Sequence, residues 1–190
     1  MGPTTAGYVL VGGRSTRFGA DKALAPWRGR PLAVWVAEQV RDAAGSATLV
    51  GDPERYQSLG LPTIPDAVTG FGPLAGVSAA LNHSPACWTL VVGCDMPNLS
   101  SDFLVSLLRL AATAAADLLL PTGPDGLDQP LCAAYSTRCR QPIADAVRRG
   151  VHKMTDGFAG LDVRRFPVAQ AGLFLNLNTP ADLAAAEVHG

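Results

Sequence analysis

The chain has 190 residues, of which 48% are apolar and 16% are charged, and its formal net charge is −1. This composition excludes a disordered chain, and the charge argues against a protein that binds nucleic acid or a membrane surface through a broad basic face. The length fits one domain, residues 1–190, with room for a single substantial core. Any phosphate ligand must therefore be held by local cations.

Short apolar runs alternate with helical patterns along the chain, which predicts βαβ units and a mostly parallel sheet. The first strand is Tyr8–Val11, and a helix runs from Pro31 to about Ala44, where Gly45 ends it. Further strands are expected at residues 47–50, 63–64, 88–92, 117–120 and 131–135, and further helices at 53–59, 74–82, 103–116 and after Thr179. The expected fold class is therefore α/β, a single-domain three-layer α/β/α sandwich with a mostly parallel sheet.

The glycine-rich stretch after the first strand carries the strongest functional signal. Gly12 and Gly13 have no Cβ, so the backbone can bend sharply there and approach a ligand closely. Arg14, Arg17 and Lys22 place three cations in one short loop, and phosphate is the partner that suits this combination. A surface loop with solvated charges is the alternative, but it leaves the coincidence of glycines, cations and strand unexplained.

This loop matches neither of two common glycine motifs. A Walker A loop requires Lys directly after its last glycine, but two residues separate Gly19 from Lys22. The dinucleotide fingerprint G-x-G-x-x-G also fails, because Arg14 follows Gly13. The loop therefore predicts a phosphate site of a different kind.

Asp95 is the second candidate, at the carboxyl end of the expected central strand at residues 88–92. Ligands of open α/β sheets bind beyond the carboxyl ends of strands, so we expect Asp95 to face the same crevice as Lys22. A carboxylate at this place suits Mg²⁺, which takes one or two carboxylates together with phosphate oxygens and water. An Asp that only caps the next turn is the weaker alternative once the glycine-rich loop is considered.

Two further segments carry polar groups next to expected strands. Asp66 follows the strand at 63–64 and either accepts hydrogen bonds from a base or ribose or stabilises its own loop. Gly72 and Gly76 flank the start of the next helix, whose N–H groups could receive an anion or a base edge.

Asn176 and Asn178 stand at alternate positions, which would place both amides on one face of a strand and in one site. Turn formation and helix capping explain Asn178 nearly as well. Thr179 followed by Pro180 is a strong helix start, with Thr179 as N-cap.

A cluster of basic residues surrounds Gly150, and its function can be interpreted in two ways. It could hold the phosphate of a second substrate, or it could be a solvated helix end, where cations also favour the helix dipole. Its members are Arg148, Arg149, His152 and Lys153.

The cysteines have no C-x-x-C spacing and no nearby His pair, which argues against a zinc site or a disulfide framework. They are Cys87, Cys94, Cys132 and Cys139. Four mostly buried free thiols suit a reducing compartment, and no stretch predicts a targeting signal or a membrane span. We therefore expect a cytoplasmic protein.

The glycine-rich loop resembles the signature L-x-G-G-x-S-x-R-x-G-x-D-K of nucleotidyltransferases that activate sugars and cofactors. Its fixed positions are filled by Leu10, Gly12, Gly13, Ser15, Arg17, Gly19, Asp21 and Lys22. The Gly-Gly and Asp-Lys version is similar to the molybdenum cofactor guanylyltransferase family, whereas related cytidylyltransferases usually carry Ala-Gly. The resemblance extends in motif order over nearly the whole chain, through Cys-Asp-Met-Pro at 94–97 to Asn-Thr-Pro at 178–180.

This resemblance implies a Rossmann-like fold of the nucleotide-diphospho-sugar transferase type. The implied reaction is transfer of GMP from GTP to the phosphate of a molybdopterin-bound cofactor, with Mg²⁺ as the metal. GTP and the molybdopterin cofactor are the implied substrates, and cofactor-delivery or molybdoenzyme proteins are further candidate partners. Arg17, Lys22 and Asp95 are the implied catalytic residues, with Asp95 as the metal ligand. The implied nucleotide-binding residues are Leu10, Val11, Gly12, Gly13, Ser15, Lys22, Asp66, Gly72, Leu74, Gly76 and Asp95, and the implied acceptor-binding residues are Asn176 and Asn178.

The residues themselves do not select the base, so three alternatives stay open. They are a cytidylyltransferase acting on the same pterin, a sugar-phosphate nucleotidyltransferase, and a non-catalytic GTP-binding protein that delivers the cofactor. The presence of Arg17, Lys22 and Asp95 together argues against the last, because a degenerate relative would be expected to lose some of them. An acceptor that is already a phosphate needs no strong general base, which agrees with the lack of an evident Ser-His-Asp or Cys-His pattern.

Overall fold

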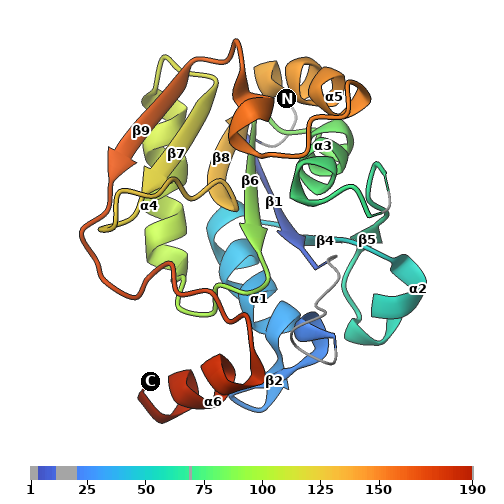
Figure 1. The fold of residues 1–190 in the computed structure, drawn as a ribbon, viewed down its shortest axis with the longest axis vertical. Coiled ribbons are helices and arrows are strands. Elements are labelled where there is room, and N and C mark those ends of the chain that lie inside the picture. Colours follow the sequence, from blue (N-terminus) through green and yellow to red (C-terminus); the bar gives the residue numbers. More distant parts are fainter. Residues whose placement is uncertain (1–3, 12–20, 69, 190) are drawn as a thin grey trace.

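The computed structural model describes residues 4–11, 21–68 and 70–189. A seven-stranded sheet in the order β5-β4-β1-β6-β8-β7-β9 forms its centre (Figure 1). The strands are β1 (Thr5–Leu10), β4 (Thr48–Val50), β5 (Thr63–Ile64), β6 (Trp88–Gly93), β7 (Leu118–Thr122), β8 (Cys132–Ser136) and β9 (Val163–Pro167). β8 is antiparallel to both β6 and β7, while the other neighbouring pairs are parallel, which confirms the mostly parallel sheet.

Helices cover both faces of the sheet, so the predicted three layers are confirmed. The helices are α1 (Leu32–Ala44), α2 (Pro53–Tyr56), α3 (Pro73–His83), α4 (Ser101–Thr113), α5 (Arg140–Arg148) and α6 (Pro180–His189). Short 3-10 helices are η1 (Lys22–Leu24), η2 (Gln57–Leu59), η3 (Thr137–Cys139) and η4 (Thr155–Phe158), and a small hairpin is formed by β2 (Pro26–Trp27) and β3 (Arg30–Pro31). One core cluster joins the sheet to α1 and α4, and the other joins it to α3 and α5.

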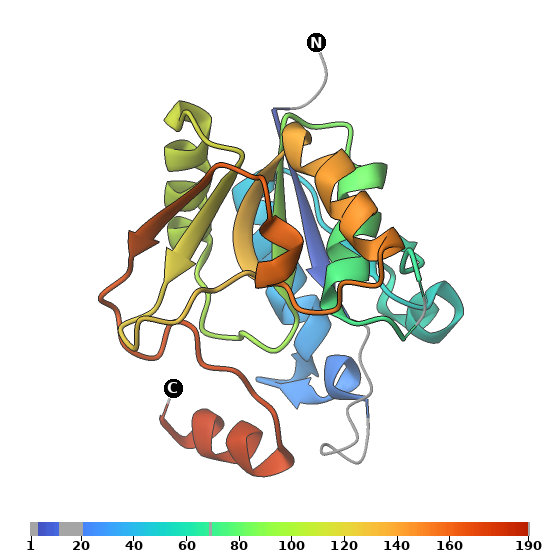
Figure 2. The same cartoon turned by 45° about the horizontal axis from the view of Figure 1, so that its top comes forward.

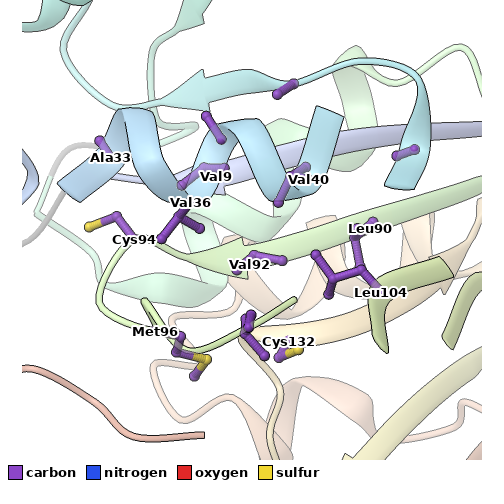
Figure 3. Packing of buried hydrophobic residues seen from close by; sticks show 14 of the residues in the cluster. Val9, Ala33, Val36, Val40, Leu90, Val92, Cys94, Met96, Leu104 and Cys132 are labelled. Atoms are coloured by element: carbon purple, nitrogen blue, oxygen red, sulfur yellow. The ribbon is translucent and has the colours of Figure 1, made fainter. Parts of the chain in front are cut away.

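The two clusters arise because successive side chains of a strand point to opposite faces. In β1, Val9 packs toward α1 and α4, whereas Tyr8 packs toward α3 and α5. Val92 and Val91 of β6 divide in the same way. Val36 of α1 lies in the same packed cluster as Val9 (Figure 3). Burying one such side chain is worth about 1.5–3 kcal/mol, so a shift of β1 or β6 by one residue would be costly.

The helix ends have ordinary capping residues, and the end of α1 at Gly45 confirms the prediction. Gly45 ends α1 in the left-handed conformation, with φ 79°, and its N–H donates to the Arg41 carbonyl. Ser100 caps α4, its side chain accepting from the Phe103 N–H. Pro31 is the N-cap of α1 and not its first helical residue, because its backbone belongs to the β2–β3 hairpin.

β9, α5 and the β2–β3 hairpin were not expected from the sequence, and neither were the short 3-10 helices η1, η3 and η4. β9 lies at an edge of the sheet, and its side chains are half-buried or exposed, so the segment lacks the apolar run of a central strand. α5 is amphipathic and carries only three buried side chains, Ile143, Ala146 and Val147. Both elements are therefore held by packing more than by a local pattern.

α6 lies beside the β2–β3 hairpin at one end of the molecule (Figures 1 and 2). A small third cluster joins them, in which Trp27, Leu32 and Leu177 are buried and Leu183 of α6 packs against them. This contact brings the C-terminal segment to the end of the sheet where β1 and β6 finish (Figure 1). In the part of the chain that the structure describes, no helix is both long enough and apolar enough to cross a membrane.

Candidate active site

Side chains from three distant parts of the chain meet at Lys22. Its Nζ donates to Asp95 Oδ2 at 3.2 Å and to Asn178 Oδ1 at 3.0 Å. These partners are 73 and 156 positions away in the chain, on the loop after β6 and on the segment before α6. Only 14% of the Lys22 side chain is exposed, so water screens this ion pair less than it would a pair on the surface.

Alternating burial turns Asp95 toward Lys22. Cys94 and Met96 are buried in the core cluster on the α1 side, whereas the Asp95 side chain between them is 23% exposed. The Cys94 N–H donates to the Leu10 carbonyl at 3.1 Å, so the segment stays beside β1 after β6 has ended. The prediction that Asp95 and Lys22 lie at the same edge of the sheet is confirmed.

Gly93 leaves room for the Asp95 carboxylate. A Cβ at position 93 would lie 2.7 Å from Asp95 Oδ1, closer than real Cβ contacts allow. Burial and then the Asp95 charge raise the pKa of the Cys94 thiol, which stays protonated at neutral pH.

Two polar side chains that the sequence analysis did not single out hold the loop after Asp95. Trp35 Nε1, from α1, donates to the Pro97 carbonyl at 2.9 Å, and Asn98 Nδ2 donates to the Gly172 carbonyl at 3.0 Å. An indole on an amphipathic helix looks like an ordinary core residue in sequence, so no local signal pointed to Trp35.

The segment at 175–178 belongs to no strand, so the expectation of two amides on one strand face is wrong. Leu177 is fully buried, and its N–H donates to the Asp95 carbonyl at 2.9 Å. Asn176 Nδ2 donates to the nearby Phe174 carbonyl at 3.2 Å. Of the two asparagines, only Asn178 therefore contacts Lys22.

A capping arrangement at the start of α6 fixes Asn178. Asp182 N–H donates to Thr179 Oγ1 at 3.1 Å, which confirms Thr179 as the N-cap. In return Asp182 Oδ2 accepts from the N–H groups of Asn178 and Thr179, at 2.9 and 2.8 Å. The hydrogen bond from the Asn178 backbone, followed by that from the Thr179 side chain, holds the pKa of Asp182 below its usual value. The carboxylate therefore stays ionised and keeps the Asn178 backbone in place.

Asp66, Leu10 at the end of β1 and Gly76 of α3 lie close together. A Cβ on Gly76 would come within 3.2 Å of Asp66 Oδ1 and 3.1 Å of Leu10 Cδ2. Burial raises the pKa of Asp66, which is half-buried. A carboxylate at this place can accept a hydrogen bond from a nucleoside next to α3.

The start of α3 has the form that the glycine pattern predicts. Gly72 is the N-cap, and its φ of 108° is a conformation that favours glycine. The Leu74 side chain is fully buried, and a Cβ added to Gly157 would lie 2.7 Å from Leu74 Cδ1. Leu74 can therefore meet a nucleotide only through its backbone.

The oxygen donors around Lys22 fit a divalent cation. Asp95 supplies a carboxylate, and Asn178 an amide oxygen, both within 3.2 Å of one ammonium nitrogen. Mg²⁺ keeps several waters and commonly binds one or two carboxylates together with substrate phosphates. The Asp95 carboxylate fits this kind of site. Among the described residues there is no group of three or more His, Cys, Asp or Glu that would form an all-protein metal cage.

The basic cluster around Gly150 is more exposed to solvent than Lys22 is. The Arg148 and Lys153 side chains are 69% and 73% exposed, and each pairs with an aspartate three residues away. His152 stacks on Phe71 with ring centroids 4.1 Å apart. Arg148 is the last residue of α5, which favours the interpretation of a solvated helix end.

A hollow of about 390 Å³ lies between α1, residues 97–100 of the loop that follows Asp95, and residues 170–173. Trp35 and Asn98 line it, but none of the site residues predicted from the sequence does. The contacts of Lys22, and not this hollow, therefore define the candidate site.

Six residues named for the glycine-rich loop lie outside the described residues, namely Gly12, Gly13, Arg14, Ser15, Arg17 and Gly19. Val11 directly precedes them, and its N–H donates to the Val50 carbonyl at 3.1 Å.

Comparisons with known proteins agree with this architecture. Residues 7–161 match a family model described as the MobA-like NTP transferase domain. A protein of Deinococcus radiodurans named "probable molybdenum cofactor guanylyltransferase" is 36% identical over 184 residues, which cover 97% of this chain and 94% of that protein.

Two solved structures have the same fold. The crystal structure of molybdopterin-guanine dinucleotide biosynthesis protein A from Archaeoglobus fulgidus superimposes with a TM-score of 0.84 at 28% identity, covering 97% of both chains. Rv0371C from Mycobacterium tuberculosis H37Rv, solved in complex with manganese, superimposes with a TM-score of 0.68 at 19% identity, covering 98% of this chain and 99% of that one. At that identity the second likeness shows the fold alone.

Proposed function

The chain belongs to the family of MobA-like NTP transferase domains, and we propose that it transfers GMP from GTP to the phosphate of a molybdopterin-bound molybdenum cofactor. Pyrophosphate is the second product. The observation that carries the proposal is the convergence of Lys22, Asp95 and Asn178 at the carboxyl ends of β1 and β6. The name of the Deinococcus relative supports the choice of base and acceptor.

The reaction needs no strong general base. An oxygen of the acceptor phosphate attacks the α-phosphorus of GTP, a new phosphoanhydride bond forms, and the bond to the pyrophosphate oxygen breaks. The electron pair of the broken bond leaves with pyrophosphate, and the acceptor is already anionic at neutral pH. The protein must therefore hold two polyanions in line and offset the charge that develops on the leaving group.

We assign a role to each proposed site residue whose position the structure describes. Lys22 lies between the Asp95 and Asn178 oxygens and neutralises phosphate charge on the leaving side. Asp95 holds Mg²⁺, Asp66 contacts the nucleoside, and Asn178 orients the acceptor. Gly12, Gly13 and Ser15 cradle the triphosphate, with Arg17 as a second cation, by the resemblance of the loop alone. A bound Mg²⁺ supplies positive charge at the phosphate oxygens.

The test is pyrophosphate release with GTP, CTP, ATP and UTP, each with the molybdopterin cofactor and with either Mg²⁺ or Mn²⁺. We expect turnover with GTP only when both acceptor and metal are present, and its loss on adding a chelator. A preference for CTP would overturn the assigned base. Binding of GTP with no turnover under any of these conditions would favour a cofactor-delivery protein.

A further inference from the structure

α2 follows Gly51 at the end of β4, and two neighbouring residues of this helix contact the chain on either side of residues 12–20. We propose that Arg55 and Tyr56 are positioning residues that hold Asp21 and Val11, and that Arg55 sets the place of Lys22 through Asp21. This inference rests on the proposed function, because it assigns Lys22 to phosphate binding.

Tyr56 holds the backbone at the end of β1. Its hydroxyl donates to the Val11 carbonyl at 2.7 Å in a buried hydrogen bond. Burial and then the nearby Asp21 charge raise the pKa of Tyr56, so the phenol remains a donor at neutral pH. A Cβ on Gly51 would lie 2.9 Å from the Tyr56 ring and 2.8 Å from Val11 Cγ2, so the glycine allows this close packing.

Arg55 and η1 share one carboxylate. Arg55 Nε lies 2.5 Å from Asp21 Oδ2, and the other oxygen, Oδ1, accepts from the Ala23 N–H at 3.0 Å. The second contact caps η1, whose first residue is Lys22. The Asp21 side chain is only 11% exposed, and among the described residues its Oδ2 accepts no hydrogen bond of good geometry besides this ion pair. Loss of Arg55 would therefore leave a largely buried carboxylate oxygen of Asp21 without a cationic partner, and Asp21 directly precedes Lys22 in the chain.

The arrangement differs from an ordinary surface ion pair. The Arg55 guanidinium lies over the Tyr56 ring, with 5.9 Å between Cζ and the centroid, so the two anchors also contact each other. Arg55 acts on Asp21, and Asp21 acts on the turn that carries the cation. The expected consequence of losing Arg55 is a misplaced Lys22 in a folded protein, and misplacement of a binding group by about 1 Å can cost about 100-fold in rate.

The first test compares Arg55→Ala with Arg41→Ala. Both arginine side chains are 54% exposed, and Arg41 pairs at 3.9 Å with its neighbour Asp42 on α1. We expect Arg55→Ala to lower kcat/KM for GTP by about 10- to 100-fold. Arg55→Lys should recover part of the loss because it keeps the charge, and Arg41→Ala should match the wild type within about twofold. Equal values for the two alanine variants, with wild-type turnover intact, would overturn the inference.

The second test asks whether Arg55 acts through Lys22. The dissociation constant for Mg-GTP is measured calorimetrically for Arg55→Ala, for Lys22→Ala and for the double variant. We expect the double variant to bind no more weakly than Lys22→Ala alone, because the group that Arg55 positions is already gone. Additive losses would mean that Arg55 acts independently of Lys22 and would reject the proposed route.

Tyr56→Phe tests the proposed contact between Tyr56 and Val11, independently of the contact made by Arg55. The ring stays against Gly51, and only the hydroxyl that donates to Val11 is lost. Tyr8→Phe is the matched control, because it removes the hydroxyl that lies 2.9 Å from His83 Nδ1. We expect the KM for GTP to rise several-fold in Tyr56→Phe only. A wild-type protein that neither binds nor turns over GTP would reject the proposed function, whereas active wild type with two indistinguishable Tyr variants would reject only this anchor.

Discussion

The chain contains two lysines, and their surroundings differ in every respect that matters for function. Lys22 is 14% exposed and contacts oxygens 73 and 156 positions away. Lys153 is 73% exposed and lies 3.8 Å from Asp156, three residues further along. Long-range contacts of a half-buried cation have to be built by the fold, whereas a local pair on the surface forms and breaks with little change in free energy. The long-range contacts of Lys22 therefore support the phosphate site that the glycine-rich loop predicts, whereas the surroundings of Lys153 give no such support.

Lys22→Ala is the strongest way to test this difference. Removing the ammonium deletes the group that we propose neutralises the leaving phosphates, and we expect kcat/KM to fall by about 100- to 1,000-fold. Pyrophosphate release with saturating metal measures the effect, and circular dichroism confirms that the variant is folded. Turnover near that of the wild type would contradict the assignment of Lys22.

Asp95→Asn tests the acidic partner of Lys22. The change keeps the size of the side chain but removes the charge that we propose binds the metal, so we expect about a 100-fold loss of kcat/KM and a higher Mg²⁺ concentration for half-maximal rate. Titration with Mg²⁺ and Mn²⁺ measures the shift. An unchanged metal dependence would show that another group holds the metal.

Gly93→Ala tests the geometry of the site without removing any polar group. The added Cβ would come within 2.7 Å of Asp95 Oδ1 and turn the carboxylate away, and we expect about a tenfold loss of activity. Gly123→Ala is the matched control, because its Cβ would meet Asp125 Oδ1 at 2.8 Å in a surface turn. Equal activity of the two variants would argue against a strict requirement on the Asp95 position.

Lys153→Ala should have the smallest effect. Its exposed ion pair contributes about 0–1 kcal/mol, so we expect activity within twofold of the wild type and a melting temperature that changes little. A clear rise in the KM for the acceptor would instead favour the interpretation of the Gly150 cluster as a phosphate site.

Much of the architecture could be predicted because local patterns report it. The apolar run at 88–92 became β6, Gly45 ended α1, and Thr179 capped α6. β9 and α5 escaped prediction because an edge strand and an amphipathic helix need few apolar residues, and packing against the rest of the protein holds them.

The part of the candidate site that lies at strand ends could be predicted from the sequence, because the strands themselves could be. Asp95, Asp66 and Leu10 follow or end strands, and parallel strands bring their carboxyl ends to one edge. The sequence could not show which of Asn176 and Asn178 contacts Lys22, because that depends on how the C-terminal segment folds back. Docking of α6 on the hairpin brings that segment to the edge, where Asn178 contacts Lys22 and Asn176 contacts its own turn.

Residue types and spacing are sufficient to indicate an α/β fold, a loop with phosphate-binding character and a carboxylate at the end of a central strand. The partners of Lys22, Asp95 and Asn178, come from contacts between distant segments. So do the contacts on which we base the proposed anchoring roles of Arg55 and Tyr56. The physical reason is that patterning reports which side chains are buried, a local property, whereas electrostatic and hydrogen-bonding partners depend on distances that exist only after the chain has packed.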